Sequence, residues 1–227
     1  MNLKKGPLSS LNMYSQAGSP LTLCLVTDQN ACLGRSLEWV VQEAIQGGVN
    51  MVQLREKNAD TRAFIEQAQR LQAILIPYQI PLIINDRVDV ALAVDADGVH
   101  VGQSDMPISY LRRLLPEGKI IGLSAETQED VLEAENFDLS YLAVSPLFAT
   151  PSKTDTKKAW GMEGLSWIRR NSRHRLLVIG GVNAENAPEA IRRGAAGIAV
   201  ISAICSAPMP AREAESLSQA ISTNDSL

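Results

Sequence analysis

Two aspartates, Asp86 and Asp105, each follow a short apolar run in this chain of 227 residues. The runs, 81–84 and 98–101, have the length and composition of buried strands. Hard divalent cations prefer carboxylate oxygens and often take a substrate phosphate as well. The pair therefore predicts a magnesium site. Helix capping is the alternative, since a helical segment follows each aspartate, and one residue can serve both purposes.

A second group of polar residues alternates along another predicted strand and its extension: Gln53, Arg55 and Lys57. In an extended backbone, alternate residues share one face. A buried arginine without an anion is costly, so Arg55 needs either an internal carboxylate, such as Asp28 or Glu56, or a bound anion. Arginine and lysine bind phosphates through charge-assisted hydrogen bonds, and we interpret this face as a diphosphate-binding surface.

Glycines and a serine late in the chain indicate a second anion site. Gly180 and Gly181 follow the apolar run 176–179, and Ser202 follows Ile201 at the end of the run 198–201. Glycine lets backbone N–H groups approach an anion, although a tight turn would use the same residues. Phosphate sites of α/β barrels often lie after the seventh and eighth strands, which favours the functional interpretation.

A long polar connection, 145–160, carries Lys153 among hydroxyl side chains that include Thr150 and Ser152. Such a loop can close over a phosphorylated ligand and exclude water, while an ordinary solvated loop is the alternative. Its length within a compact domain favours a functional role.

The elements that would position these groups alternate regularly. Continuous apolar strands joined by helical crossovers indicate a parallel sheet, and eight repeats indicate a closed (β/α)8 TIM barrel. No GxGxxG follows the first strand, which disfavours an open doubly wound sheet. All the polar groups above lie just past strand ends, where active sites of this barrel lie. The predicted strands are 21–27, 51–54, 81–85, 98–101, 120–124, 141–144, 176–179 and 198–201, and the predicted helices are 36–46, 61–75, 88–94, 107–115, 127–135, 163–170, 188–193 and 211–222.

Composition limits the partners and the compartment. A net charge of −4 without a basic stripe argues against nucleic acid and anionic membranes. No apolar run reaches the roughly 18 residues of a membrane helix, and no signal peptide is visible. Three widely spaced cysteines form no metal pattern, so we expect core residues in a cytoplasmic protein. We predict an N-terminal extension over 1–19 and one barrel domain over 20–227, and the sequence leaves open whether the chain forms a homo-oligomer.

The two histidines receive different predictions. His100 lies inside a strand, where a lone histidine is more often a hydrogen-bonded barrel residue than a ligand. His174 lies among four arginines, and we expect it at the solvated surface.

In their order along the chain, these segments resemble the thiamine-phosphate synthase family over about residues 21–205. Each segment alone is weak evidence for the family, whereas their succession on strand ends is specific to it. The segments that carry the resemblance are 53–57 (QLREK), 85–87 (NDR), 97–103 with Asp105, 122–124, 146–153, 179–181 and 200–204.

The resemblance implies a Mg²⁺-dependent transferase of thiamine biosynthesis that joins a hydroxymethylpyrimidine diphosphate to a hydroxyethylthiazole phosphate. It implies that Asp86 and Asp105 carry Mg²⁺ and that Arg55, Lys57, Ser124 and Lys153 are catalytic. The pyrimidine diphosphate would be bound by Gln53, Leu54, Arg55, Glu56, Lys57, Asn85, Ser124 and Lys153, and the thiazole phosphate by Thr150, Pro151, Ser152, Gly181, Ile201 and Ser202.

The chain departs from the family pattern at four positions: Ser145, Ala149 and Ser152 in the loop, and Glu126, where many members have histidine. We expect these changes to affect the conformation of the loop and the turnover rate. Two rival functions remain. A thiazole tautomerase would need neither Mg²⁺ nor pyrimidine diphosphate, and the aspartate pair speaks against it. A non-catalytic sensor of a thiazole phosphate would need neither the lysines nor the aspartates.

Overall fold

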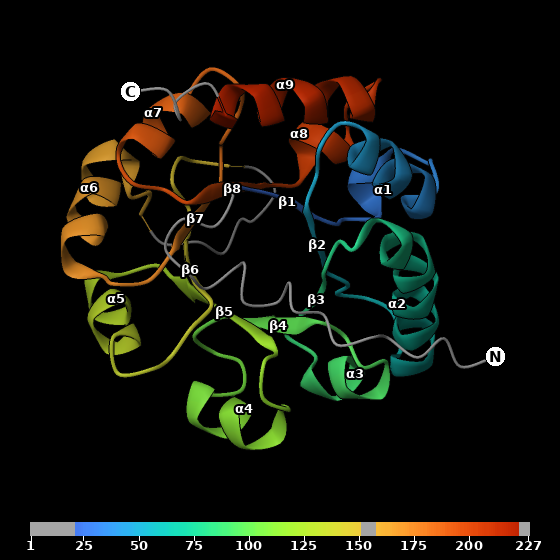
Figure 1. Cartoon of the computed structure of the whole chain (residues 1–227), viewed down its shortest axis with the longest axis horizontal. Coiled ribbons are helices and arrows are strands. Elements are labelled where there is room, and N and C mark those ends of the chain that lie inside the picture. Colours follow the sequence, from blue (N-terminus) through green and yellow to red (C-terminus); the bar gives the residue numbers. More distant parts are fainter. Residues whose placement is uncertain (1–20, 151–157, 223–227) are drawn as a thin grey trace.

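Eight parallel strands close into a barrel in sequential order, which confirms the predicted (β/α)8 fold. The computed structural model describes residues 21–150 and 158–222 (Figure 1). Every predicted strand is present, with both ends within one residue of the prediction, because each is a short, mostly apolar run. The strands are β1 Thr22–Val26, β2 Met51–Leu54, β3 Leu82–Asn85, β4 Gly98–Val101, β5 Ile120–Ala125, β6 Tyr141–Val144, β7 Leu176–Ile179 and β8 Gly197–Val200.

Helices form an outer ring around the strands (Figure 1). The side chains of Ser36, Asp60 and Thr127 accept backbone N–H bonds at the starts of three of them, which is why the sequence located those starts correctly. A four-residue helix, α8, directly after β8 was not predicted. The helices are α1 Leu37–Gln46, α2 Thr61–Leu75, α3 Val88–Ala93, α4 Ile108–Leu114, α5 Gln128–Ala134, α6 Gly161–Asn171, α7 Ala187–Arg192, α8 Ser202–Cys205 and α9 Pro210–Ser222, with 3-10 turns at Asn30–Cys32 and Ile76–Tyr78.

Alternation along each strand separates two cores. In β2, Val52 and Leu54 face outward into the layer between strands and helices. Met51 faces inward and joins a smaller interior core that also contains Ile83 and Leu177. This apolar plug fills the lower barrel, so the inward residues nearer the carboxyl ends of the strands surround an open space.

The buried state of the cysteines confirms their predicted role. Cys24, Cys32 and Cys205 are fully buried free thiols. No helix within residues 21–150 and 158–222 is long and apolar enough to cross a membrane. The predicted extension, 1–19, lies outside the described residues.

His174 corrects the prediction of a surface histidine. Its side chain is 4% exposed, and Nε2 lies 3.0 Å from the carbonyl oxygen of Ala134 and 3.5 Å from a carboxylate oxygen of Glu135. The nearby Arg169 donates to the carbonyls of Ser172 and His174 instead of facing water. The arginines suggested solvent, but the segment folds back onto α5, a long-range contact that local composition does not reveal.

Candidate active site

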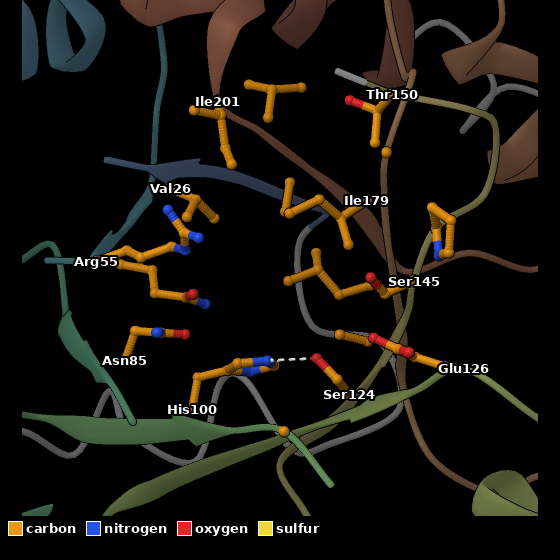
Figure 2. Close-up of a pocket in the computed structure, with 18 of the residues that line it drawn as sticks. Val26, Arg55, Asn85, His100, Ser124, Glu126, Ser145, Thr150, Ile179 and Ile201 are labelled. Atoms are coloured by element: carbon orange, nitrogen blue, oxygen red, sulfur yellow. Dashed lines mark hydrogen bonds between the residues drawn. The ribbon is translucent and has the colours of Figure 1, made fainter. Parts of the chain in front are cut away.

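A cavity of about 470 Å³ opens at the carboxyl ends of the strands. Gln53, Asn85, His100 and Ser124 are among its polar lining residues. In Figure 2, Asn85, His100 and Ser124 lie along one side of the cavity, and Ile179 and Ile201 lie across from them. The apolar side chains of the lining include Val26, Ala143, Leu177, Ile179, Ala199 and Ile201. A cleft that combines apolar surface with convergent polar groups is typical of a site for small organic molecules.

The predicted cationic face is present at the end of β2. Arg55 and Lys57 both line the cavity. Each has a carboxylate nearby: Nη1 of Arg55 lies 3.7 Å from Oδ2 of Asp28, and Nζ of Lys57 lies 2.6 Å from Oδ2 of Asp86. Asp28 was one of the two internal partners considered for Arg55. At 3.7 Å the contact is a loose ion pair, which leaves the guanidinium able to bind an anion in the cavity.

The two predicted metal ligands come together, and neither caps a helix. Helix α3 has Arg87 and α4 has Pro107 at the capping position, both without a side-chain cap. Asp105 accepts a 2.7 Å bond from the Gly102 N–H. Burial, and then the adjacent Asp86 carboxylate with which it shares a hydrogen bond, hold the pKa of Asp105 above its ordinary value.

Two adjacent carboxylates suit a cation, because a bound positive charge would relieve their repulsion. Within the described part of the chain, no cluster of three or more His, Cys, Asp or Glu side chains could hold a metal. A pair of protein oxygens is what Mg²⁺ commonly uses, with waters and substrate phosphate completing its octahedron. Asp86 and Asp105 therefore fit this ion.

A hydrogen-bonded network lines the cavity and joins side chains from β4, β5 and β6. Nδ1 of His100 lies 3.0 Å from the Tyr141 hydroxyl, and Nε2 lies 2.9 Å from Oγ of Ser124 (Figure 2). Tyr141 also shares a hydrogen bond with the side chain of Gln53, and burial raises its pKa. The prediction that His100 is a hydrogen-bonded barrel residue is confirmed, and the structure adds that it lines the cavity.

The second predicted anion site lies on the opposite rim, after β7 and β8. Gly181, Ile201 and Ser202 line the cavity together with Thr150. Gly181 has φ +64°, and a Cβ there would lie 2.8 Å from Cβ of Phe148. Glycine is therefore required both by the backbone conformation and by the approach of the β6–α6 loop. The short helix α8 begins at Ser202, an arrangement that barrels use to bind phosphate.

Not every predicted site residue reaches the cavity. Leu54 is fully buried in the outer core, because it alternates with Gln53 on the opposite face of β2. The Glu56 carboxylate turns back to accept the N–H groups of Asn58 and Ala59. The structure therefore does not bring these two side chains to the cavity. The predictions for Pro151, Ser152 and Lys153 lie outside the described residues.

Several cavity residues were not predicted as site residues from sequence: Tyr141, Gln103, Ser145 and Glu126. Tyr141 starts an apolar strand and gave no polar signal. Glu126, a departure from the family pattern, directs its carboxylate toward the space beside Ser124 and Ser145 (Figure 2). Its position two residues after Ser124 at a strand end was the one signal that could have found it.

The barrel, its carboxyl-end cavity and the paired acidic and basic side chains define a (β/α)8-barrel enzyme for small anionic substrates. A family model described as thiamine monophosphate synthase matches residues 23–204. The chain belongs to the thiamine monophosphate synthase family.

Individual relatives agree with the family match. The chain is 53% identical over 201 residues to a thiamine-phosphate synthase of Albidiferax ferrireducens, covering 88% of this chain and 92% of the relative. It is 50% identical over 195 residues to one of Vibrio campbellii, with 86% and 95% covered. Among solved structures, a thiamine phosphate pyrophosphorylase from Pyrococcus furiosus superposes with a TM-score of 0.81 at 37% identity, over 88% of this chain and 95% of the other.

Proposed function

We propose that this cavity joins 4-amino-2-methyl-5-(diphosphooxymethyl)pyrimidine to 4-methyl-5-(2-phosphooxyethyl)thiazole, giving thiamine phosphate and diphosphate. The C–O bond between the pyrimidine methylene and the diphosphate breaks, and the diphosphate leaves with the electron pair. A C–N bond forms from the thiazole nitrogen lone pair to the methylene carbon. The electron-rich aminopyrimidine stabilises the intervening benzyl-like cation, so the substitution is dissociative and needs little acid–base catalysis.

The leaving group would lie on the β2–β4 side of the cavity. Arg55 and Lys57 would bind diphosphate oxygens through charge-assisted hydrogen bonds. Asp86 and Asp105 would hold Mg²⁺, which when bound supplies charge neutralisation for the diphosphate. Stabilising charge that develops in the transition state is usually the largest single contribution to catalysis.

The thiazole phosphate would lie on the β7–β8 side. Gly181, Ser202 and Thr150 line that rim, and Ile201 adjoins the apolar side of the cavity. The apolar side chains can pack against both rings and keep water away from the cation. By resemblance, Pro151 and Ser152 join this subsite, while Lys153 binds the pyrimidine diphosphate.

The observation that carries the proposal is that one cavity has two different rims whose residues are suited to anions. The cations and the acidic pair lie on one side, and Gly181 and Ser202 lie on the other. A volume of about 470 Å³ is within the range of small-molecule sites. A transferase that joins two phosphorylated heterocycles needs both rims facing one space.

We also propose a cytoplasmic enzyme that acts on small molecules without nucleic acid or membrane partners. The three free cysteines suit a reducing compartment, and the net charge of −4 disfavours polyanionic partners.

A coupling assay tests the proposal. The purified protein is mixed with both substrates, with and without Mg²⁺, and thiamine phosphate is detected as fluorescent thiochrome. We expect product only when Mg²⁺ is present. Product formation that survives complete chelation would remove the metal assignment. No product, with the thiazole phosphate still bound, would favour the tautomerase or the sensor.

A further inference from the structure

Two buried residues outside the rims, Tyr141 and His100, connect the two polar groups that face the pyrimidine side of the cavity. Tyr141 shares a hydrogen bond with Gln53 on β2 and lies 3.0 Å from Nδ1 of His100 on β4. The other imidazole nitrogen lies 2.9 Å from Oγ of Ser124 on β5. Gln53, Tyr141, His100 and Ser124 thus form a chain of hydrogen bonds across the barrel.

Packing fixes this chain in place. Tyr141 is 4% exposed and His100 is 6% exposed, and their rings stack with centroids 5.5 Å apart and an interplanar angle of 13°. Gly122 pairs with Tyr141 in the sheet, and a Cβ at Gly122 would lie 2.2 Å from Cζ of the tyrosine ring. The glycine therefore makes the space through which the tyrosine reaches His100.

The chemistry of the chain limits what its two ends can offer. A neutral imidazole has one N–H and one lone pair, and a hydroxyl that accepts one bond donates the next. If Gln53 donates to Tyr141, then Tyr141 donates to His100 and His100 donates to Ser124. The Gln53 carbonyl oxygen then faces away from Tyr141 toward a ligand, and the Ser124 hydroxyl has its proton left to donate. In the reverse direction, Gln53 retains a donor and Ser124 retains an acceptor.

In each direction, the Gln53 atom that faces away from Tyr141 and the Ser124 hydroxyl are complementary: the Gln53 oxygen accepts where Ser124 can donate, and the Gln53 nitrogen donates where Ser124 can only accept. A 4-aminopyrimidine matches this requirement, because its amino group donates and its ring nitrogens accept. When Gln53 donates to Tyr141, the Gln53 oxygen faces the amino group of the ring. A 4-oxo ring presents the opposite order at the same edge, and its binding would require every bond in the chain to reverse.

We propose that Tyr141 and His100 are positioning residues that select a 4-aminopyrimidine by fixing the donor and acceptor orientation of Gln53 and Ser124. The proposal rests on the function proposed above and assigns the determinant of its pyrimidine specificity. Neither residue needs to touch the reacting atoms.

Tyr141→Phe tests the proposal, because it removes the linking hydroxyl and keeps the ring that fills the space above Gly122. We expect kcat/KM for the pyrimidine diphosphate to fall roughly 10-fold or more, the loss typical of a hydrogen bond whose buried partners stay unpaired. KM for the thiazole phosphate should stay within about twofold, because that rim is untouched. Tyr110→Phe on the exposed face of α4 is the matched control and should match wild type.

The preference for the 4-amino over the 4-oxo ligand distinguishes a positioning role of Tyr141 and His100 from a space-filling role. The 4-oxo analogue of the pyrimidine diphosphate serves as competitive inhibitor, and its Ki is compared with the calorimetric Kd of the 4-amino substrate. We expect the ratio of the 4-oxo Ki to the 4-amino Kd to fall at least several-fold in Tyr141→Phe. His100→Gln, which retains a donor and an acceptor, should keep more of the ratio than His100→Leu, whereas a space-filling role would make these two variants equal.

The outcomes distinguish this proposal from the proposed function. Wild-type coupling together with unchanged kinetics and discrimination in Tyr141→Phe would overturn the positioning role and leave the function intact. No wild-type coupling, with the 4-amino ligand still preferred and that preference lost in Tyr141→Phe, would overturn the function and keep the positioning role. A wild-type protein that binds neither pyrimidine would overturn both.

Discussion

The ammonium group of Lys57 lies 2.6 Å from Oδ2 of Asp86 and joins the end of β2 to the end of β3. One carboxylate of the acidic pair is thereby balanced within the protein. The other, Asp105, has a raised pKa because it is partly buried and lies beside Asp86. The cavity thus combines cations for an anionic substrate with an acidic pair suited to a metal ion.

Asp86→Asn and Asp105→Asn test the metal assignment. Asparagine preserves the shape and, like aspartate, tolerates the left-handed conformation of Asp86, φ 62°. Neither residue caps a helix, so the fold should survive. We expect the Mg²⁺ concentration for half-maximal rate to rise roughly 100-fold or more, beyond the 10- to 100-fold loss seen for groups that only support a metal ligand. Metal titrations of the coupling rate measure this.

Asp89→Asn serves as the control for these variants. Asp89 is exposed on α3 and pairs with Arg87, away from the cavity. An equal loss of Mg²⁺ response in this variant, or an unchanged response in both Asp86→Asn and Asp105→Asn, would argue against metal binding by the pair.

Arg55→Gln tests the diphosphate side. The guanidinium faces the cavity and pairs only loosely with Asp28, so its loss should act on the ligand more than on the fold. Hydrogen bonds to charged groups contribute about 1.5–3 kcal/mol, which corresponds to roughly 10- to 150-fold in kcat/KM for the pyrimidine diphosphate. Steady-state kinetics provide the measurement, and Arg62→Gln on the exposed surface of α2 is the control. A rise in KM for the thiazole phosphate alone would place the diphosphate elsewhere.

Gly181→Ala tests the opposite rim. The new Cβ would meet Cβ of Phe148 at 2.8 Å and the carbonyl oxygen of Ala149 at 3.0 Å, displacing the loop that carries Thr150. We expect KM for the thiazole phosphate to rise at least 10-fold, because even small displacements of positioning groups can cost about 100-fold.

Gly118→Ala is the matched control for Gly181→Ala. Gly118 also has a positive φ, +85°, but its Cβ would meet nothing within 4 Å. It therefore carries the same type of backbone strain without crowding. If both variants raised the thiazole KM equally, strain alone would explain the result and the phosphate assignment would lose its support.

Substitutions of His174 test its buried, hydrogen-bonded position. Because its partner at 3.0 Å is the Ala134 carbonyl, Nε2 must be the donor. His174→Ala should lower the free energy of unfolding by about 1–3 kcal/mol, the cost of an unsatisfied buried acceptor. His174→Gln, which keeps an N–H of similar reach, should recover part of the loss. Urea unfolding measures both, and an unchanged stability in His174→Ala would mean that the histidine contact is dispensable.

Sequence patterns predicted the barrel well, because each strand is a short, mostly apolar run and three helices begin with a capping side chain. They also placed Arg55, Lys57, Asp86 and Asp105 on one rim, because carboxyl ends of parallel strands meet at one end of a barrel. Helix α8 escaped prediction because four residues are too short for a helical period to be visible.

The network of Tyr141 and His100 could not be predicted, because it depends on strand register. The two residues are 41 positions apart and meet only because Gly122, on the strand between them, leaves room for the tyrosine ring. The prediction for His174 was wrong for a similar reason, because its burial depends on a contact with α5. Long-range contacts of this kind decide side-chain roles that local composition leaves open.

The stoichiometry of the two products shows whether one cavity joins both substrates. Diphosphate and thiamine phosphate are measured in the same reaction, with both substrates and Mg²⁺ present. We expect one diphosphate to be released per thiamine phosphate formed, and both products to be lost when Mg²⁺ is removed. Diphosphate release without thiamine phosphate would identify a hydrolase and would contradict the claim that one cavity holds both substrates.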